Sequence, residues 1–128
     1  MARWRLLARA AGLQVRTLVT MEGEPVLCLQ SRRAKPAPLV YLSAGVHGDE
    51  VGAAWGLLFW AEKHLEKLRA ERFLIFPCLN PHGLRANTRL DQRGLDINRR
   101  FHLPEDPLSG PWSRLIAENP PALGLCLH

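Results

Sequence analysis

Two short apolar runs on either side of a helical segment constrain the fold of this chain more than any other feature. The runs are PLVYLSAG at residues 38–45 and RFLIFPCLN at residues 72–80, and each is typical of a strand covered on both faces. Between them, apolar residues recur at steps of three and four, as they do in an amphipathic helix. They are Val51, Ala54, Trp55, Leu58, Ala61, Leu65 and Leu68. A strand, a helix and a second strand in succession predict an α/β sheet with helices on its faces.

The N-terminal third is expected to add a helix and a hairpin. The basic, amphipathic residues 1–16 predict a short helix, and two strand-like runs around MEGEP, within residues 15–32, predict a hairpin with its turn at Gly23 and Pro25. The polar, proline-containing residues 31–38 are then expected to connect this hairpin to the first apolar run.

The C-terminal part is expected to contain a long loop, a helix and a last strand. Residues 80–107 are rich in Asn, Asp, Arg, Gly and Pro and have no clean periodicity, which predicts a loop. A loop of this length within a compact domain is usually functional. The next segment predicts a helix with Pro111 at its first position, and PALGLCLH at 121–128 predicts a strand.

Composition limits the classes of protein to consider. The 128 residues are 47% hydrophobic and 23% charged, which suits one globular domain, and no apolar run approaches the length of a membrane span. Arg5 and Arg9 interrupt the apolar stretch that a signal peptide would need. We therefore expect a cytoplasmic protein with no membrane partner. The net charge of +5 would permit nucleic-acid binding, but the arginines are spread along the chain without a nucleic-acid motif, so we expect no such partner.

The three cysteines do not suggest a metal site. Cys28, Cys78 and Cys126 are widely spaced among apolar neighbours and form no CxxC pair. We expect buried free thiols on strands.

Polar motifs follow the predicted strands. HGDE at 47–50, NPHG at 80–83 and His128 each lie where an apolar run ends. Because ligands bind beyond the carboxyl ends of strands in open α/β sheets, these residues are expected to converge on one site.

His47 and Glu50 are candidate zinc ligands. Their spacing of three places both on one side of a turn, and imidazole nitrogen and carboxylate oxygen both bind zinc. A catalytic zinc takes three protein ligands and a water, and His128 at the end of a predicted strand would suit the third position. Plainer alternatives remain open: Asp49 could be an N-cap, Glu50 could favour the helix dipole, and a terminal His128 could be frayed.

The loop contributes candidate substrate contacts. Arg89, Asn98 and Arg99 could form a cluster of fixed donors, because guanidinium binds a carboxylate bidentately and stays charged. An arginine beside zinc can also stabilise a developing oxyanion. The alternative is a solvated basic loop.

In order and spacing, HGDE, NPHGL, Arg89 and GLDINRRF resemble the zinc metallocarboxypeptidase family. The likeness is greatest to its murein peptide amidase-like branch, which is related to succinylglutamate desuccinylase and aspartoacylase. It is densest over residues 41–101. The resemblance implies a mixed, mostly parallel α/β sheet of the phosphorylase/hydrolase-like zinc carboxypeptidase type.

The resemblance also implies roles for individual residues. His47, Glu50 and His128 would be the zinc ligands, and Arg89 would polarise the scissile carbonyl. Two further residues would grip the substrate's terminal carboxylate, namely Asn98 and Arg99. The chain departs from the family pattern at Arg100, where asparagine is usual, and at His82, where aspartate is usual.

A further departure concerns the general base. The family's chain continues past the third ligand into a half that carries the specificity pocket and a catalytic glutamate, which has no counterpart here. We therefore expect residues 1–128 to be the N-terminal part of a single zinc carboxypeptidase-like catalytic domain, truncated, inactive as given, and with its final strand intended for the sheet interior.

Four functions are consistent with these residues. The first is zinc-dependent hydrolysis of a C-terminal peptide or amide bond in a substrate with a free carboxylate. The second is zinc-dependent deacylation of an N-acyl amino acid. The third is a non-catalytic fragment that binds zinc or anionic peptides. The fourth, a nucleic-acid-binding domain, predicts strongly salt-dependent affinity.

Overall fold

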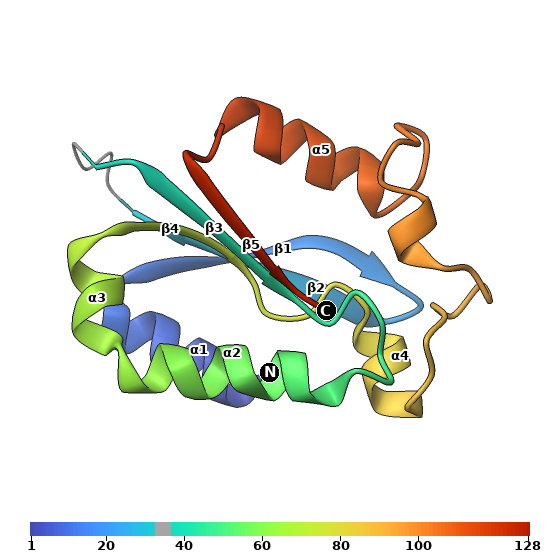
Figure 1. The fold of residues 1–128 in the computed structure, drawn as a ribbon, viewed down its shortest axis with the longest axis horizontal. Helices are drawn as coiled ribbons and strands as arrows, with labels where there is room; N and C mark the ends of the chain where they lie inside the picture. The colour runs from blue at the N-terminus through green and yellow to red at the C-terminus, as the bar shows by residue number, and fades with distance from the viewer. Residues whose placement is uncertain (33–36) are drawn as a thin grey trace.

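A computed structural model of the chain describes residues 1–32 and 37–128 (Figure 1). Part of the predicted connection over 31–38, residues 33–36, lies outside the described residues. Across the described part of the chain, five strands form one mixed sheet in the order β1-β2-β4-β3-β5. The strands are β1 (Leu13–Met21), β2 (Glu24–Ser31), β3 (Leu39–Ala44), β4 (Arg72–Phe76) and β5 (Leu123–Leu127).

The sheet combines an antiparallel and a parallel part. β2 runs antiparallel to both β1 and β4, whereas β3 runs parallel to both β4 and β5. Glu22 and Gly23 connect β1 to β2 with φ angles of 48° and 81°, as a two-residue hairpin turn requires. The predicted α/β class and the N-terminal hairpin are confirmed.

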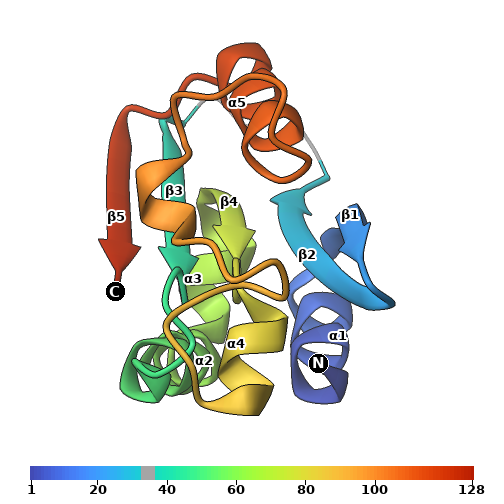
Figure 2. The same cartoon turned by 90° about the vertical axis from the view of Figure 1, so that its right-hand side faces the viewer.

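Helices cover both faces of the sheet (Figures 1 and 2). On one face pack α1 (Ala2–Ala11), α2 (Val51–Lys63) and α3 (Leu65–Ala70), against a core that includes Leu42 and Ile75. On the other face lies α5 (Ser109–Glu118), whose Trp112 contacts a second core around Tyr41. The predicted two-sided arrangement is therefore confirmed. No helix of the described residues is both long and apolar enough to cross a bilayer.

The long helix predicted over 51–68 is wrong in two respects. It is interrupted at His64, whose φ and ψ of −116° and 39° are not helical, and whose Nδ1 lies 2.8 Å from the Trp60 carbonyl oxygen. Its buried face is also rotated from the predicted one, because Leu57 is buried whereas Val51 and Trp55 are exposed. The periodicity identified a helix, but the sheet selected which face became buried.

The predicted loop over 80–107 contains two short helical segments. These are α4 (Pro81–Ala86) and a 3₁₀ turn, η1 (Ile97–Arg99). Asn80 caps α4 by accepting a hydrogen bond from the Gly83 N–H (2.9 Å), and Pro81 occupies the first helical position. Since Asn-Pro is a recognised helix start, this element could have been predicted from the sequence.

The predicted C-terminal helix and strand are both present. α5 begins at Ser109, two residues before the predicted start at Pro111. β5 pairs with β3 and lies at the edge of the described sheet with Leu123 and Leu125 exposed, as expected for a strand whose other neighbour is not among residues 1–128.

The cysteines are free thiols, as predicted, but they differ in burial. Cys28 and Cys78 are buried, and burial raises the pKa of each thiol to about 11. Cys126 is exposed on β5 because that face of the edge strand is uncovered, so the prediction of burial was wrong for it.

Candidate metal centre

The loops after β3 and β4 leave the sheet side by side. Beyond the paired strands, the Leu79 N–H donates to the Ala44 carbonyl (3.0 Å) and the Asn80 N–H donates to the Gly45 carbonyl (2.8 Å). HGDE and NPHG, 33 residues apart in the sequence, therefore both begin at the carboxyl ends of neighbouring strands. Open α/β sheets bind their ligands beyond these strand ends.

The two loops touch through glycine. A Cβ built on Gly48 would lie 1.8 Å from the carbonyl carbon of Gly83, and a Cβ on Gly83 would lie 2.4 Å from Nδ2 of Asn80. Neither separation is sterically allowed, so Gly48 is required for the approach of the two backbones and Gly83 for the capping position of the Asn80 side chain. This contact sets the position of the HGDE loop relative to α4.

Three predicted ligand residues converge beside this contact. His47 Nδ1 lies 3.1 Å from Glu50 Oε1, and His128 Nδ1 lies 3.1 Å from both His47 Nδ1 and Glu50 Oε2. His47 is 1% exposed, Glu50 is half-buried just before α2, and His128 follows β5 and is exposed. In the part of the chain that the structure describes, this is the group of His, Cys, Asp and Glu side chains placed to share a metal ion.

A second carboxylate holds the other side of the His47 ring. His47 Nε2 lies 3.0 Å from Asp96 Oδ1 and Nδ1 lies 3.1 Å from Glu50 Oε1, so each ring nitrogen faces a carboxylate that can accept a hydrogen bond. A metal shared with Glu50 and His128 would take the Nδ1 lone pair and leave the ring hydrogen on Nε2, where Asp96 accepts it. A carboxylate that orients a ligand histidine in this way is a common accompaniment of metal sites.

Asp96 also joins Arg89 to the centre. Nε and Nη2 of Arg89 donate to Asp96 Oδ2 at 3.2 and 3.0 Å. The Asn80 amide donates to the carbonyls of Arg89 (3.3 Å) and Leu90 (3.2 Å), which fixes the backbone there. Arg89, the predicted catalytic arginine, thus shares the Asp96 carboxylate with His47.

The charges of the centre lower the pKa values of both carboxyls. The hydrogen-bonding contact with His47, supported by His128, holds the pKa of Glu50 below its usual range. Burial alone would raise the pKa of Asp96, but hydrogen bonds from His47, Arg89 and the Asn98 N–H outweigh it and lower the pKa. Both groups are therefore ionised at neutral pH, and Glu50 is available to a cation.

The donor set fits a divalent metal such as zinc. Two imidazole nitrogens and a carboxylate oxygen match the ligands that zinc takes at catalytic sites. Ligand bonds of about 2.0 Å at tetrahedral angles place ligand atoms about 3.3 Å apart, close to the 3.1 Å separations seen here. Two ring nitrogens and a carboxylate facing one another are also best accommodated by a shared cation.

The predicted carboxylate-binding residues lie directly after Asp96. Asn98 and Arg99 are on η1, where the Asn98 N–H donates to Asp96 Oδ1 (2.9 Å) and the Arg99 side chain is exposed. Both residues therefore closely follow Asp96, which contacts His47, and the Arg99 side chain is open to solvent.

Ion pairs hold the loop that carries these residues. Arg93 bonds Asp91 (2.6 Å) and Asp106 (3.0 Å), and Arg100 bonds Asp106 (2.7 Å). Both carboxylates are almost completely buried and also accept backbone N–H bonds, those of Leu95 and Leu108 among them. Arg100, where the resembling family usually has asparagine, thus anchors the loop.

The remaining histidines lie apart from this group. His64 contacts the Trp60 carbonyl and stacks on the Trp60 ring, and His82 lies on the first turn of α4. His102 is exposed. The functional residue that sequence reasoning missed is Asp96, although it lies inside the GLDINRRF motif and could have been found there.

A comparison with protein families agrees with this geometry. The sequence model of the succinylglutamate desuccinylase/aspartoacylase catalytic domain matches residues 36–113, which include HGDE, NPHG and GLDINRRF. The chain belongs to this family. The resemblance to this group of proteins that the sequence motifs indicated is therefore confirmed.

A curated relative points to the carboxypeptidase side of the same group. Cytosolic carboxypeptidase 1 from Gallus gallus is 34% identical over 79 residues, which are 56% of this chain and 6% of the relative. This relative and the solved structures described next carry the names of hydrolases, and the names of two of those structures include a metal.

Solved structures confirm the fold. A protein from Shewanella amazonensis SB2B described as a metallopeptidase is 26% identical and covers 74% of this chain and 36% of its own, with a TM-score of 0.68. The metallo-carboxypeptidase from Burkholderia cenocepacia is 21% identical over 98% of this chain and 38% of its own, with a TM-score of 0.83. The murein-tripeptide amidase from Escherichia coli O157 is 20% identical over 88% of this chain and 59% of its own, at 0.67. The chain thus spans between about a third and three fifths of these structures.

Proposed function

We propose that this chain provides the metal-binding half of a zinc-dependent hydrolase of the metallocarboxypeptidase type. The observation that carries the proposal is the convergence of His47, Glu50 and His128, with all ligand atoms within 4.8 Å of one another. The substrate class we propose is a peptide, or an acyl-amino acid, with a free carboxylate. A membrane or nucleic-acid partner is not part of the proposal, and a cytoplasmic location stays a prediction.

Zinc in such a site lowers the pKa of its bound water to near neutrality and polarises a carbonyl. The residues of this chain would prepare that chemistry. Asp96 keeps the hydrogen of His47 on Nε2, so that Nδ1 faces Glu50 and His128 as a lone-pair donor. His47 is held in this orientation without rearrangement, because its ring is buried and bonded on both sides.

Arg89 is proposed to stabilise the oxyanion. Its Nε and Nη2 are engaged by Asp96, which leaves Nη1 for a substrate oxygen. Arg99 and the side chain of Asn98 are proposed to hold the free carboxylate of the substrate, since both follow the Asp96 anchor and Arg99 is exposed.

The second candidate is a zinc-dependent N-acyl amino acid deacylase. The family match over residues 36–113 supports it directly, because succinylglutamate desuccinylase and aspartoacylase name that family. The NPHGL and GLDINRRF motifs and the carboxypeptidase relative support the peptidase instead. Both reactions would use the same metal centre and the same clamp for a carboxylate.

We further propose that residues 1–128 are the N-terminal part of a single catalytic domain. The chain spans half or less of several matching structures, while almost all of it is matched by them. The general base would be supplied by a segment that corresponds to the part of those structures not covered by residues 1–128. By itself, this chain would bind zinc and carboxylates without turning over substrate, which is also the behaviour of a non-catalytic binding fragment.

Zinc content tests the metal centre. The purified chain should contain about one zinc by elemental analysis, and His47→Ala should contain none because the buried ligand is lost. His102→Ala removes an exposed histidine outside the group and should retain the metal. Equal zinc in the parent and in His47→Ala would refute the site, as would a folded, zinc-free parent.

Calorimetry separates the substrate classes. The zinc-loaded chain should bind a dipeptide with a free C-terminus more tightly than its amidated form, and Arg99→Ala should remove that preference. Preferential binding of an N-acyl amino acid over the dipeptide would favour the deacylase. Indifference to the carboxylate would contradict the clamp.

A further inference from the structure

The outer face of α2 carries an apolar stripe that neither the fold nor the proposed function uses. Val51, Trp55 and Phe59 recur at steps of four and are 40%, 48% and 54% exposed. Val51 and Trp55 border a pocket that is also lined by Trp4 of α1 and Leu84 of α4, and Phe59 is the most exposed of the three. A contiguous exposed patch of this kind is typical of an interaction surface.

The stripe has notches as well as projections. The rings of Trp55 and Phe59 stack with their centroids 5.8 Å apart. Beside them, a Cβ built on Gly52 or on Gly56 would meet nothing within 4 Å. The face therefore has two bulky side chains, Trp55 and Phe59, beside two glycines that leave open space, and each pair is four residues apart.

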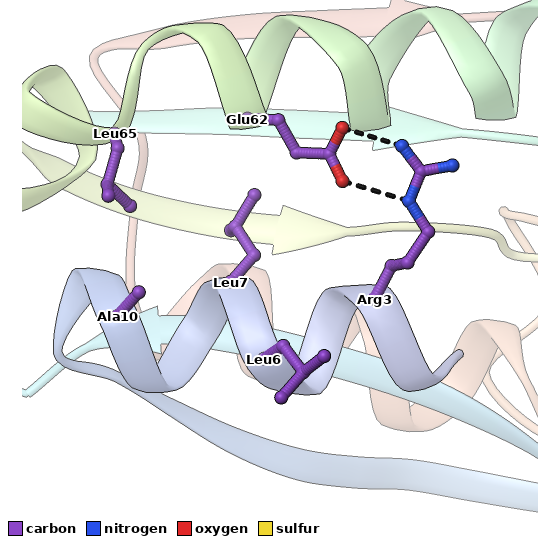
Figure 3. A pocket seen from close by; sticks show the side chains of 6 residues that line it. All are labelled: Arg3, Leu6, Leu7, Ala10, Glu62 and Leu65. Atoms are coloured by element: carbon purple, nitrogen blue, oxygen red, sulfur yellow. Dashed lines mark hydrogen bonds and ion pairs between the residues drawn. The ribbon is translucent and has the colours of Figure 1, made fainter.

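One side of the stripe is held by α1. The guanidinium carbon of Arg3 lies 5.5 Å from the Trp55 ring centroid and 5.3 Å from that of Phe59. Arg3 also donates two hydrogen bonds to Glu62, at 2.9 and 2.6 Å (Figure 3). The rings are thus fixed against α1 before any partner arrives, which lowers the entropy lost on association.

We propose that a second copy of this chain docks on this face, with the two α2 helices antiparallel about a twofold axis near Gly56. In that register, Trp55 lies over the partner's Gly56 and Phe59 lies over the partner's Gly52. Because a twofold interface uses the same patch on both copies, a patch that is its own complement fits a second copy best.

The charges at the ends of α2 agree with this arrangement. Asp49 is exposed just before the N-terminal end and Lys63 is exposed at the C-terminal end. The antiparallel register brings Lys63 beside the partner's Asp49, and it also places the positive end of each helix dipole against the negative end of the other. A parallel pairing would bring like charges together.

The interface goes beyond the proposed hydrolase and affects its centre. Glu50 directly precedes α2, so the first turn that carries this ligand would rest against the last turn of the partner's α2. The two metal centres would lie at opposite ends of the helix pair, both open to substrate.

Sedimentation equilibrium over a range of concentrations tests the proposal. We expect a particle of two 14.4 kDa chains at high concentration. Gly56→Leu fills a notch without touching its own chain, so the circular-dichroism spectrum should stay folded while the dimer dissociation constant rises at least about tenfold. Trp55→Glu should have the same effect through the loss of the projecting ring. Leu125→Glu, on the exposed edge strand β5, is the matched control and should leave the dimer unchanged.

Charge reversal tests the orientation. Asp49→Lys and Lys63→Glu should each weaken the dimer, and the double variant should restore it, because only the antiparallel pairing brings these residues together. A chain that is monomeric throughout would overturn the proposal. So would a dimer indifferent to Gly56→Leu and Trp55→Glu, one lost with Leu125→Glu, or a double variant that is no better than the single ones.

Discussion

At the scale of single residues, Asp96 determines how His47 can act. Its carboxylate lies 3.0 Å from His47 Nε2 and accepts from Arg89 at 3.0 Å, so that one half-buried anion orients both a candidate ligand and a neighbouring cation. Without it, the ring of His47 could bind in either tautomer. The chemistry of the centre thus depends on a residue that does not itself belong to the ligand group.

Asp96→Asn should weaken zinc binding about 10- to 100-fold, because an amide orients the ring less strongly and does not raise its basicity. Competition with a chromogenic zinc chelator measures the affinity. Asp49→Asn, an exposed carboxylate two residues from His47, is the control and should leave the affinity unchanged. Equal affinities for parent and Asp96→Asn would show that the hydrogen bond has no bearing on the metal.

Gly48→Ala should destabilise the fold by at least about 2 kcal/mol, because its methyl group would overlap the backbone at Gly83. Urea unfolding followed by circular dichroism measures the change. Gly124→Ala adds the same methyl at ordinary contact distance, 3.7 Å from the Tyr41 ring, and should change stability little. Equal effects of the two substitutions would argue against the close approach of the HGDE loop and α4.

At the scale of elements, the segment from Asp91 to Asp106 is ordered mainly by ion pairs. The carboxylate of Asp106 accepts from Arg100, Arg93 and the N–H groups of Leu108 and Ser109. Burial alone would raise the pKa of Asp106, but these bonds outweigh it and hold the pKa well below its usual range. This network ties the loop that carries Asn98 and Arg99 to the start of α5.

The lowered pKa predicts acid sensitivity. Asp106 is ionised in the folded state to a lower pH than in the unfolded chain, where its pKa is about 3.9. Its contribution to stability is therefore complete above that value and is lost as the pH falls through the folded pKa. Asp106→Asn should lower the free energy of unfolding at pH 7 by about 2 kcal/mol and by less at pH 3.

Urea unfolding at the two pH values tests this difference. Glu105→Gln alters the neighbouring exposed carboxylate and should change stability little at either pH. An Asp106→Asn loss that is as large at pH 3 as at pH 7 would contradict the role of the ionised network.

Elements also differ in how far local sequence determines them. The hairpin and α4 have strong local signals, in the Glu22-Gly23 turn and the Asn80-Pro81 start. The end of α2 at His64 and the exposure of Trp55 have none, because they depend on where the sheet and α1 lie. Apolar spacing identifies a helix but not which of two apolar faces a neighbour will cover.

At the scale of the whole molecule, the candidate centre joins three elements that are distant in sequence. His47 follows β3, Glu50 precedes α2 and His128 follows β5, and the two histidines are 81 positions apart in the chain. A metal at this point would hold the edge strand to the helix and to the central strand. Metal binding should therefore stabilise the fold as a whole.

Free zinc at 100 times its dissociation constant should raise the unfolding free energy by about 2.7 kcal/mol, or Tm by roughly 10 °C. His128→Ala should abolish this increase while leaving the metal-free Tm nearly unchanged, because the side chain is exposed. Differential scanning calorimetry with zinc and with a chelator provides the comparison. A zinc-dependent rise that persists in His128→Ala would exclude this residue as a ligand.

The sequence alone determined the α/β class, the hairpin, the family relationship and the proposed ligands His47, Glu50 and His128. Each depends on local chemistry, namely the side-chain pattern of a strand or helix and the motifs at its ends. Tertiary structure alone decided which ring nitrogen of His47 Asp96 contacts, the glycine contact at Gly48 and the exposed stripe on α2. These features arise between segments far apart in the chain, and such contacts exist only once the sheet has brought the segments together.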